Sequence, residues 1–127
     1  MLHGSLGYLR TRVDRAAPGD QIGKEFERGP HWSGSAGADW SPAKSVHLSG
    51  LLRFHSAYSS DNFDTPELRV SSAATIDARA AYDVGRFTLF AYAHNLLDSL
   101  QLLYRYDANY AELEDPRVVG IGLDARF

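Results

Sequence analysis

The last eleven residues, Arg117 to Phe127, place the tightest constraint on what this chain can fold into. Every second residue counted back from the carboxyl terminus is apolar: Phe127, Ala125, Leu123, Ile121 and Val119. Apart from Val118, the intervening positions are charges and glycines, and this alternation predicts a β-strand with two unlike faces. Strands of soluble sheets usually have about 5–6 residues, whereas a strand tilted across a bilayer needs about 9–11. A long terminal strand that ends on an aromatic residue favours an outer-membrane β-barrel over the edge of a soluble sheet.

Five earlier segments alternate in the same way. We therefore predict an all-β fold: an antiparallel six-stranded meander that is a segment of a transmembrane β-barrel. The expected strands are 2–13, 31–41, 44–58, 72–83, 86–95 and 117–127. In the second of them, Trp32 and Trp40 stand at the two ends of a run of small residues, which would place one indole at each membrane interface.

The connections between these strands alternate in length. Long polar loops are expected at 14–30, 59–71 and 96–116, and tight turns at 41–44 and 83–85. Outer-membrane barrels have long extracellular loops and short periplasmic turns. If Phe127 lies on the periplasmic side, counting the strands back from it places every long loop outside the cell. Within the third loop, Leu96–Tyr104 is the stretch most compatible with a short helical turn.

Composition excludes several classes of protein. The 127 residues suffice for one domain, and a formal net charge of −3 argues against nucleic acid as a partner. The absence of cysteine excludes disulfides and thiolate chemistry. The sequence contains no run of about 18 apolar residues, so no transmembrane helix is predicted. The first residues lack the pattern of a signal peptide. If the protein is exported, we expect its amino-terminal part to lie outside this chain.

Two stretches near the end carry a family resemblance. The run from Phe87 to Asp98, FTLFAYAHNLLD, resembles the penultimate strand of TonB-dependent outer-membrane receptors, which ends in Asn-Leu-x-Asp. Farther along, those receptors carry Pro-Arg before a last strand that ends in Phe, as Pro116-Arg117 and Phe127 do here. The stretches Arg28–Pro30 and Ala78–Tyr82 also resemble sequences of this receptor family.

The resemblance implies a receptor that takes up a scarce ligand such as a siderophore, in the bacterial outer membrane. Such receptors have a barrel of about 22 strands, and six strands are fewer than the roughly eight of the smallest bacterial barrels. An open sheet would leave two edges in the bilayer. We therefore expect residues 1–127 to be the C-terminal part of a receptor barrel, unable to transport alone. The implied partners are outer-membrane lipid, the barrel-assembly machinery and, through the full-length parent, the plug domain and the TonB complex.

The candidate site residues lie at the alternate strand positions that carry polar side chains. The contacts expected for a ligand or the plug in the barrel lumen are Arg53, His55, Asp77, Arg79, Tyr92 and His94. Salt pairing across strands is the expected role of Asp77 and Arg79. In the terminal strand, the residues that resemble the recognition signal for the barrel-assembly machinery are Val119, Ile121, Leu123, Ala125 and Phe127.

Other chemistry is not indicated. The five histidines lack the spacing of metal ligands, and no G-x-S-x-G elbow marks a nucleophile, so neither an enzyme nor a cofactor is expected. Asp61, Asn62 and Asp64 lack the carboxylate spacing of a calcium loop and read as an acidic loop tip. The alternative function is a soluble β-sandwich module for binding or interaction, in which a second sheet would cover the apolar face.

Overall fold

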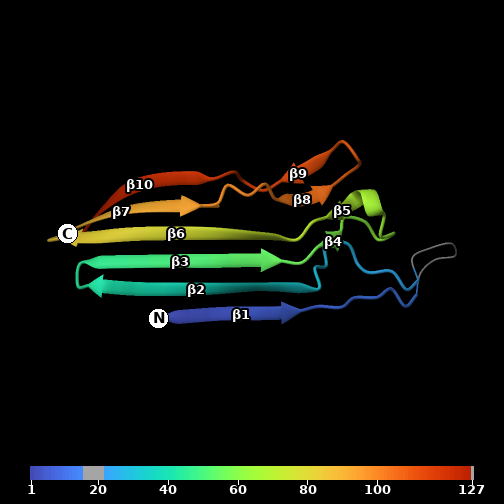
Figure 1. The fold of residues 1–127 in the computed structure, drawn as a ribbon, viewed down its shortest axis with the longest axis horizontal. Coiled ribbons are helices and arrows are strands. Elements are labelled where there is room, and N and C mark those ends of the chain that lie inside the picture. The colour runs from blue at the N-terminus through green and yellow to red at the C-terminus, as the bar shows by residue number, and fades with distance from the viewer. Residues whose placement is uncertain (16–21, 127) are drawn as a thin grey trace.

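The chain forms one broad, single-layered sheet with irregular segments gathered at one end (Figure 1). The computed structural model describes residues 1–15 and 22–126. Six strands pair in the order β1-β2-β3-β6-β7-β10, and every neighbouring pair is antiparallel. These strands are β1 (Leu2–Tyr8), β2 (Trp32–Ala43), β3 (Val46–His55), β6 (Ala73–Val84), β7 (Phe87–His94) and β10 (Val118–Ala125). The predicted six-stranded antiparallel meander is confirmed.

The two faces of the sheet differ as the alternation predicts. Side chains on one face are apolar and many are exposed, with Leu2 at 85% and Ile121 at 83%. This apolar face ends in aromatic residues on both sides: Tyr8, Trp32 and Phe54 near the long loops, and Trp40, Tyr82 and Phe87 near the tight turns. Among the described residues no second sheet covers it, because the two other sheets are two-stranded and lie in the loops.

Tight turns join the strands at one end of the sheet, here called the turn end. β2 continues through Ala43, beyond the predicted boundary, because an irregularity between Trp40 and Ala43 accommodates Pro42 within the strand. The second turn lies between Val84 and Phe87, where Gly85 has a φ of 63°. Each predicted turn is thus present but displaced by a few residues along the chain.

The opposite end, here called the loop end, carries more structure than expected. The second loop contains β4 (Tyr58–Ser59), a 3₁₀ turn at Pro66–Leu68 and β5 (Arg69–Val70); the third contains β8 (Leu102–Arg105) and β9 (Ala111–Leu113). The helical turn suggested for Leu96–Tyr104 is wrong, because β8 pairs with β9 there. The third predicted strand stops at His55, and β4 pairs away from the main sheet.

The first strand is shorter than the predicted 2–13, because pairing with β2 ends at Tyr8 opposite Trp32. Beyond it the chain still donates single backbone hydrogen bonds, from Leu9 N–H to the His31 carbonyl and from Val13 N–H to the Lys24 carbonyl, both 2.9 Å. Part of the first loop, 16–21, lies outside the described residues, as does Phe127. No helix in the described ranges is long and apolar enough to cross a membrane.

The edge strands run in opposite directions. β1 runs toward the loop end and β10 toward the turn end, because five successive antiparallel pairings separate them. Little of the sheet is buried in this open arrangement. The two fully buried side chains with the largest volumes, Val70 and Ser60, lie in the loop region.

Candidate functional site: the polar face of the sheet

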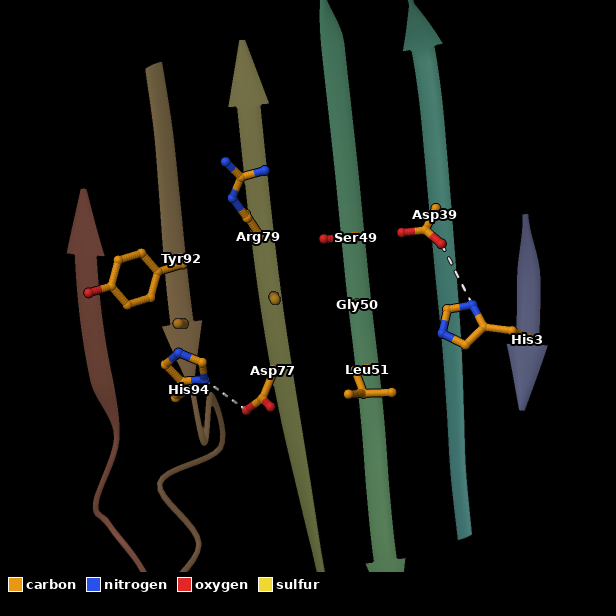
Figure 2. Close-up of a pocket in the computed structure, with 11 residues that line it drawn as sticks. His3, Asp39, Ser49, Gly50, Leu51, Asp77, Arg79, Tyr92 and His94 are labelled. Carbon is orange, nitrogen blue, oxygen red and sulfur yellow. Dashed lines mark ion pairs between the residues drawn. The ribbon is translucent and has the colours of Figure 1, made fainter. Parts of the chain in front are cut away.

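The register of the strands gathers hydrophilic side chains on the face opposite the apolar one, here called the polar face. Arg53 pairs with Thr75, Leu51 with Asp77, and Arg79 with both Ser49 and Tyr92. Side chains from neighbouring strands therefore project in the same direction. Figure 2 shows part of this surface, with His3 turned toward Asp39 and His94 turned toward Asp77.

Asp77 is the centre of a charged cluster near the loop end. Its Oδ2 lies 2.5 Å from the Arg53 guanidinium, and its Oδ1 lies 3.6 Å from Nδ1 of His94. Oδ1 also accepts a hydrogen bond of 3.1 Å from the backbone N–H of Asn95. Only 17% of the Asp77 side chain is exposed. Three of the residues proposed from the sequence, Arg53, Asp77 and His94, thus come together around one carboxylate.

Arg79 takes part in a second cluster beside β10. Its guanidinium carbon lies 4.5 Å from the centre of the Phe90 ring, and an Nη atom lies 4.0 Å from the Asp124 carboxylate. Asp77 and Arg79 therefore both pair with residues of other strands. Arg79 remains 45% exposed, so its charge is available on the polar face.

Two aromatic rings lie across the glycines of β10. A Cβ built on Gly120 would approach the Tyr92 ring to 2.5 Å, and one built on Gly122 would approach the Phe90 ring to 2.3 Å. A side chain at either position would displace the neighbouring ring, so glycine at these positions lets the two rings lie close to the β10 backbone. The ring centres lie 6.4 Å apart with their planes tilted by 32°, and the Arg79 guanidinium lies over the Phe90 ring.

A shallow depression of about 370 Å³ lies on the polar face. Its polar lining side chains are His3, Asp39, Ser49, Asp77, Arg79, Tyr92 and His94 (Figure 2). His55 lies apart from it, where its Nδ1 is 2.9 Å from the Ser56 carbonyl and its ring is 5.4 Å from that of Tyr58. Across residues 1–15 and 22–126, no three His, Asp or Glu side chains are grouped to hold a metal ion.

A chain of hydrogen bonds crosses the turn end of the same face. His47 lies 3.0 Å from Ser41 Oγ through Nδ1 and 3.1 Å from Asp83 through Nε2. Thr88 donates to the other Asp83 oxygen at 2.5 Å. These contacts join β2, β3, β6 and β7. No pattern in the sequence predicts them, because they depend on the register of the strands at the turn end.

The Asn-Leu-x-Asp run has a structural role that its spacing alone does not reveal. The Asn95 side-chain amide donates to the Ser99 and Asp115 carbonyls at 3.0 and 3.3 Å, and the Asp98 carboxylate accepts from Arg117 N–H at 3.1 Å. Asn95 and Asp98 both have positive φ, 48° and 54°. The run therefore joins the end of β7 to the chain entering β10, across the base of the third loop.

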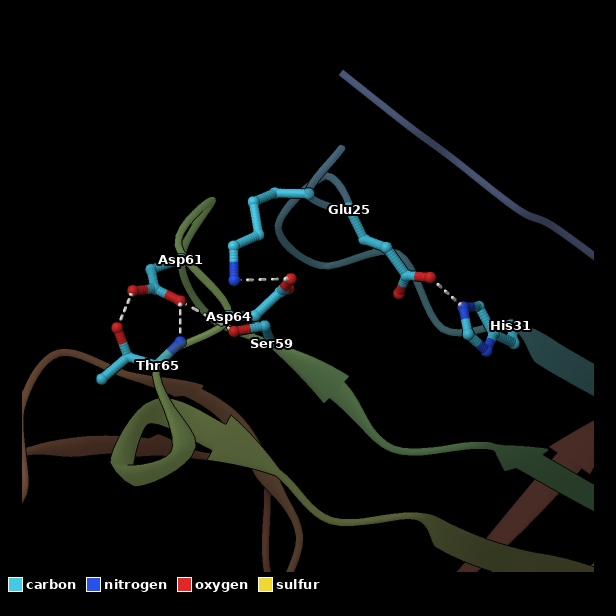
Figure 3. Close-up of polar contacts among 7 residues, drawn as sticks. Glu25, His31, Ser59, Asp61, Asp64 and Thr65 are labelled. Atoms are coloured by element: carbon cyan, nitrogen blue, oxygen red, sulfur yellow. Dashed lines mark hydrogen bonds and ion pairs between the residues drawn. The ribbon is translucent and has the colours of Figure 1, made fainter. Parts of the chain in front are cut away.

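The second loop is organised by Asp61 (Figure 3). Its carboxylate accepts hydrogen bonds from Ser59 Oγ at 2.8 Å, from Thr65 N–H at 3.0 Å and from the Thr65 hydroxyl. Burial acts to raise the pKa of Asp61, but hydrogen bonds from Thr65 and Ser59 outweigh it and hold the pKa below its ordinary value. The Asp61 carboxylate is thus occupied by the loop's own donors.

Further contacts link the loops to one another. The Arg28 guanidinium lies 4.3 Å from the centre of the Tyr104 ring, and Ser60 Oγ accepts from Arg105 N–H at 2.9 Å. Tyr58 donates its hydroxyl to the Leu103 carbonyl at 2.7 Å. Burial raises the pKa of Tyr58 despite the opposing charge of Arg28, so the hydroxyl keeps its proton for this bond. The three loops therefore form one connected region over the loop end.

Comparison with known proteins defines the class. Residues 1–96 match the model of the family described as TonB dependent receptor-like, beta-barrel, and the chain belongs to this family. Barrels of this family are outer-membrane proteins of Gram-negative bacteria. The family match ends within the resembling run at 95–98 and before the one at 116–117, but the structure neighbours extend over most of the chain.

Three solved receptors share the fold. The siderophore receptor PiuA from Acinetobacter baumannii is 16% identical over 96% of this chain, with a TM-score of 0.82. The ferric citrate transporter FecA in its unliganded form is 22% identical over 93%, with a TM-score of 0.78. BauA, the ferric preacinetobactin receptor from Acinetobacter baumannii, is 21% identical over 96%, with a TM-score of 0.72. This chain covers 19% of the length of each of these receptors.

Proposed function

We propose that residues 1–127 are the C-terminal wall of a receptor barrel in the bacterial outer membrane, and that the whole receptor takes up a ferric chelate such as a siderophore with energy from TonB. The family match over residues 1–96 is the observation that carries this proposal. The three solved receptors that share the fold are named for a siderophore, ferric citrate and ferric preacinetobactin, which supports this class of ligand. The chain alone would not transport, because the plug and most of the barrel are not among its strands.

In this proposal the polar face lines the lumen. Arg79, Tyr92 and His94 would meet the plug or a passing ligand, since Arg79 and His94 are 45% and 63% exposed. Arg53 and Asp77 would mainly hold each other, as their separation of 2.5 Å indicates. His55 would contribute to the outer mouth, beside Tyr58. We propose no catalytic role for any of these residues.

The soluble sandwich is not favoured. That fold needs a second sheet about 10 Å from the first, packed on its apolar side chains. In the described part of the chain, the apolar face of the six-stranded sheet is uncovered and bordered by aromatic residues at both ends. A bilayer provides the apolar contact that such a face needs, and the aromatic rows suit its two interfaces.

Accessible tags test the placement and orientation. A tag inserted near Asp61 or Ala108, in the second and third loops, should be labelled on intact cells that produce the receptor containing this chain. A tag at Lys44, in a tight turn, should be labelled only after the outer membrane is permeabilised. Labelling of the loop tags only after permeabilisation would contradict the orientation, and recovery of the protein in the soluble fraction would contradict the membrane location.

Uptake tests the ligand class separately. Cells in which this receptor is the only outer-membrane route should accumulate radiolabelled iron supplied as ferric citrate or ferric preacinetobactin, and should stop when TonB is deleted. A matched strain whose receptor lacks residues 1–127 should not accumulate iron. No TonB-dependent uptake of either chelate, with the receptor correctly placed in the membrane, would contradict the proposed class of ligand.

A further inference from the structure

A positively charged segment continues β1 beyond the aromatic border of the apolar face. Tyr8 and Trp32 form that border here, with their ring centres 4.7 Å apart. The next residues include Arg10, Arg12 and Arg15, which are all exposed. Leu9 N–H bonds to the carbonyl of His31, just before β2, and Val13 exchanges hydrogen bonds with Gly23 and Lys24, so the chain beyond β1 continues alongside the returning segment. Alternation then places Arg10 and Arg12 on the same side as Tyr8, facing away from the lumen.

These arginines are only weakly neutralised. The ion pair from Arg12 Nε to Asp14 is 3.9 Å long, and the two side chains are 72% and 87% exposed, so solvent screens it strongly. The Arg10 side chain is also exposed. On the adjacent segment, Glu25 is held by His31 at 2.7 Å. The segment therefore presents a net positive charge to whatever lies outside the barrel wall.

The height of the segment matches one layer of a membrane. At about 3.3 Å per residue, Arg10 lies about 7 Å beyond Tyr8 along the strand and Arg12 about 13 Å beyond it. A bilayer with about 30 Å of hydrocarbon and 40–45 Å in total leaves about 5–8 Å of headgroups on each side. With Tyr8 at the edge of the hydrocarbon and the strand tilted, Arg10 falls within the headgroup layer and Arg12 at its outer surface.

We propose that Arg10 and Arg12 form a binding site for the phosphate groups of an anionic lipid in the outer leaflet, with Tyr8 and Trp32 against its acyl chains. A guanidinium donates two parallel hydrogen bonds to a phosphate, which a lysine cannot reproduce. The two arginines alternate on one side of an extended chain, about 7 Å apart, so they bind two phosphates of one headgroup or of adjacent headgroups. This proposal rests on the membrane placement given under Proposed function.

Lipid retained during purification tests the site. The receptor containing this chain is extracted from outer membranes in mild detergent, and its bound phosphorylated glycolipid is quantified. The double variant Arg10→Gln/Arg12→Gln is compared with Lys44→Gln/Arg86→Gln, which removes two positive charges at the turn end. Each arginine near an anionic surface strengthens binding by about fivefold, so the first variant should bind about thirtyfold more weakly and the control should match the wild type.

A second measurement separates lipid from free phosphate. The tryptophan fluorescence of the receptor should shift on titration with micelles of diphosphoryl lipid A, and the part of the shift that Trp32→Phe removes reports on this site. Inorganic phosphate and zwitterionic phosphatidylethanolamine should not produce that part of the shift, and Arg10→Gln/Arg12→Gln should abolish it. An equal response to inorganic phosphate would show an anion site without lipid specificity and overturn the proposal.

The outcomes distinguish this proposal from the one it rests on. Equal glycolipid retention by the wild type and by Arg10→Gln/Arg12→Gln, with both proteins folded in the outer membrane, would overturn the lipid site alone. Failure of the wild type to reach the outer membrane would overturn the membrane placement itself. The conservative variant Arg10→Lys/Arg12→Lys should retain intermediate binding, because the charge remains while the paired hydrogen bonds are lost.

Discussion

At the scale of single residues, Asp77 is the carboxylate on the polar face that we expect to stabilise the sheet most. It accepts from a guanidinium and a backbone N–H while 17% exposed. Asp77→Asn keeps the shape but removes the charge, so the free energy of unfolding should fall by about 1.5–3 kcal/mol, as for hydrogen bonds to charged groups. Urea unfolding, followed by the shift in gel mobility of the unheated barrel, measures the change.

The matched control is Asp124→Asn, since Asp124 is 63% exposed and its contact with Arg79 is 4.0 Å long. That variant should lose less than about 1 kcal/mol. Adding Arg53→Gln to Asp77→Asn should cost less than the two changes separately, because the pair has already been broken. Equal losses for Asp77→Asn and Asp124→Asn would show that the Asp77 cluster does not stabilise the sheet.

The contribution of the Asp61 carboxylate to the stability of the second loop should depend on pH. Hydrogen bonds in the folded loop lower its pKa, so its contribution is present above the ordinary aspartate pKa of about 3.9 and is lost as the pH falls through the lower folded value. Protection of the Thr65 amide from exchange, corrected for its intrinsic rate, should therefore be constant near neutrality and decrease below about pH 4. Asp61→Asn should remove this dependence, and Glu67→Gln should leave it intact.

At the scale of elements, β10 depends on its glycines. Gly122→Ala should displace the Phe90 ring, because a Cβ would lie 2.3 Å from it, and should cost only about 0.5–1 kcal/mol, since the free end of the ring can move aside and the contact at risk is the one with Arg79. Gly50→Ala is the control, since its Cβ would meet only the Asp77 carbonyl at 3.8 Å. In a Phe90→Ala background the cost of Gly122→Ala should largely disappear; an unchanged cost would mean that the ring is not its source.

Sequence reasoning works well for elements and poorly for what links them. Alternation along Ala73–Val84 and Phe87–His94 predicts both faces of the sheet, because one face must be apolar wherever it meets hydrocarbon. The β8 and β9 strands were missed because Leu102–Arg105 and Ala111–Leu113 are too short to show a period. The Asp77 cluster combines residues of β3, β6 and β7, and only the register determines which of them meet.

At the scale of the whole molecule, the terminal strand bears on assembly. Phe127 lies outside the described residues, and its role stays a prediction together with that of Val119, Ile121, Leu123 and Ala125, which continue the apolar face of β10. An exposed strand edge can pair with a strand of the assembly machinery, and alternate side chains supply specificity. In the full-length receptor, Phe127→Ser should lower the amount of folded barrel in outer-membrane fractions more than Arg126→Ser does. Equal amounts would leave Phe127 without an assembly role.

The opposite directions of β1 and β10 have a consequence for how such barrels diversify. β1 begins and β10 ends at the turn end, so the six strands form three complete hairpins. Recombination that exchanges this segment between receptors keeps every other strand in its orientation and every long loop on its own side. The connections at the loop end can thus be exchanged in blocks while the direction of every other strand stays unchanged.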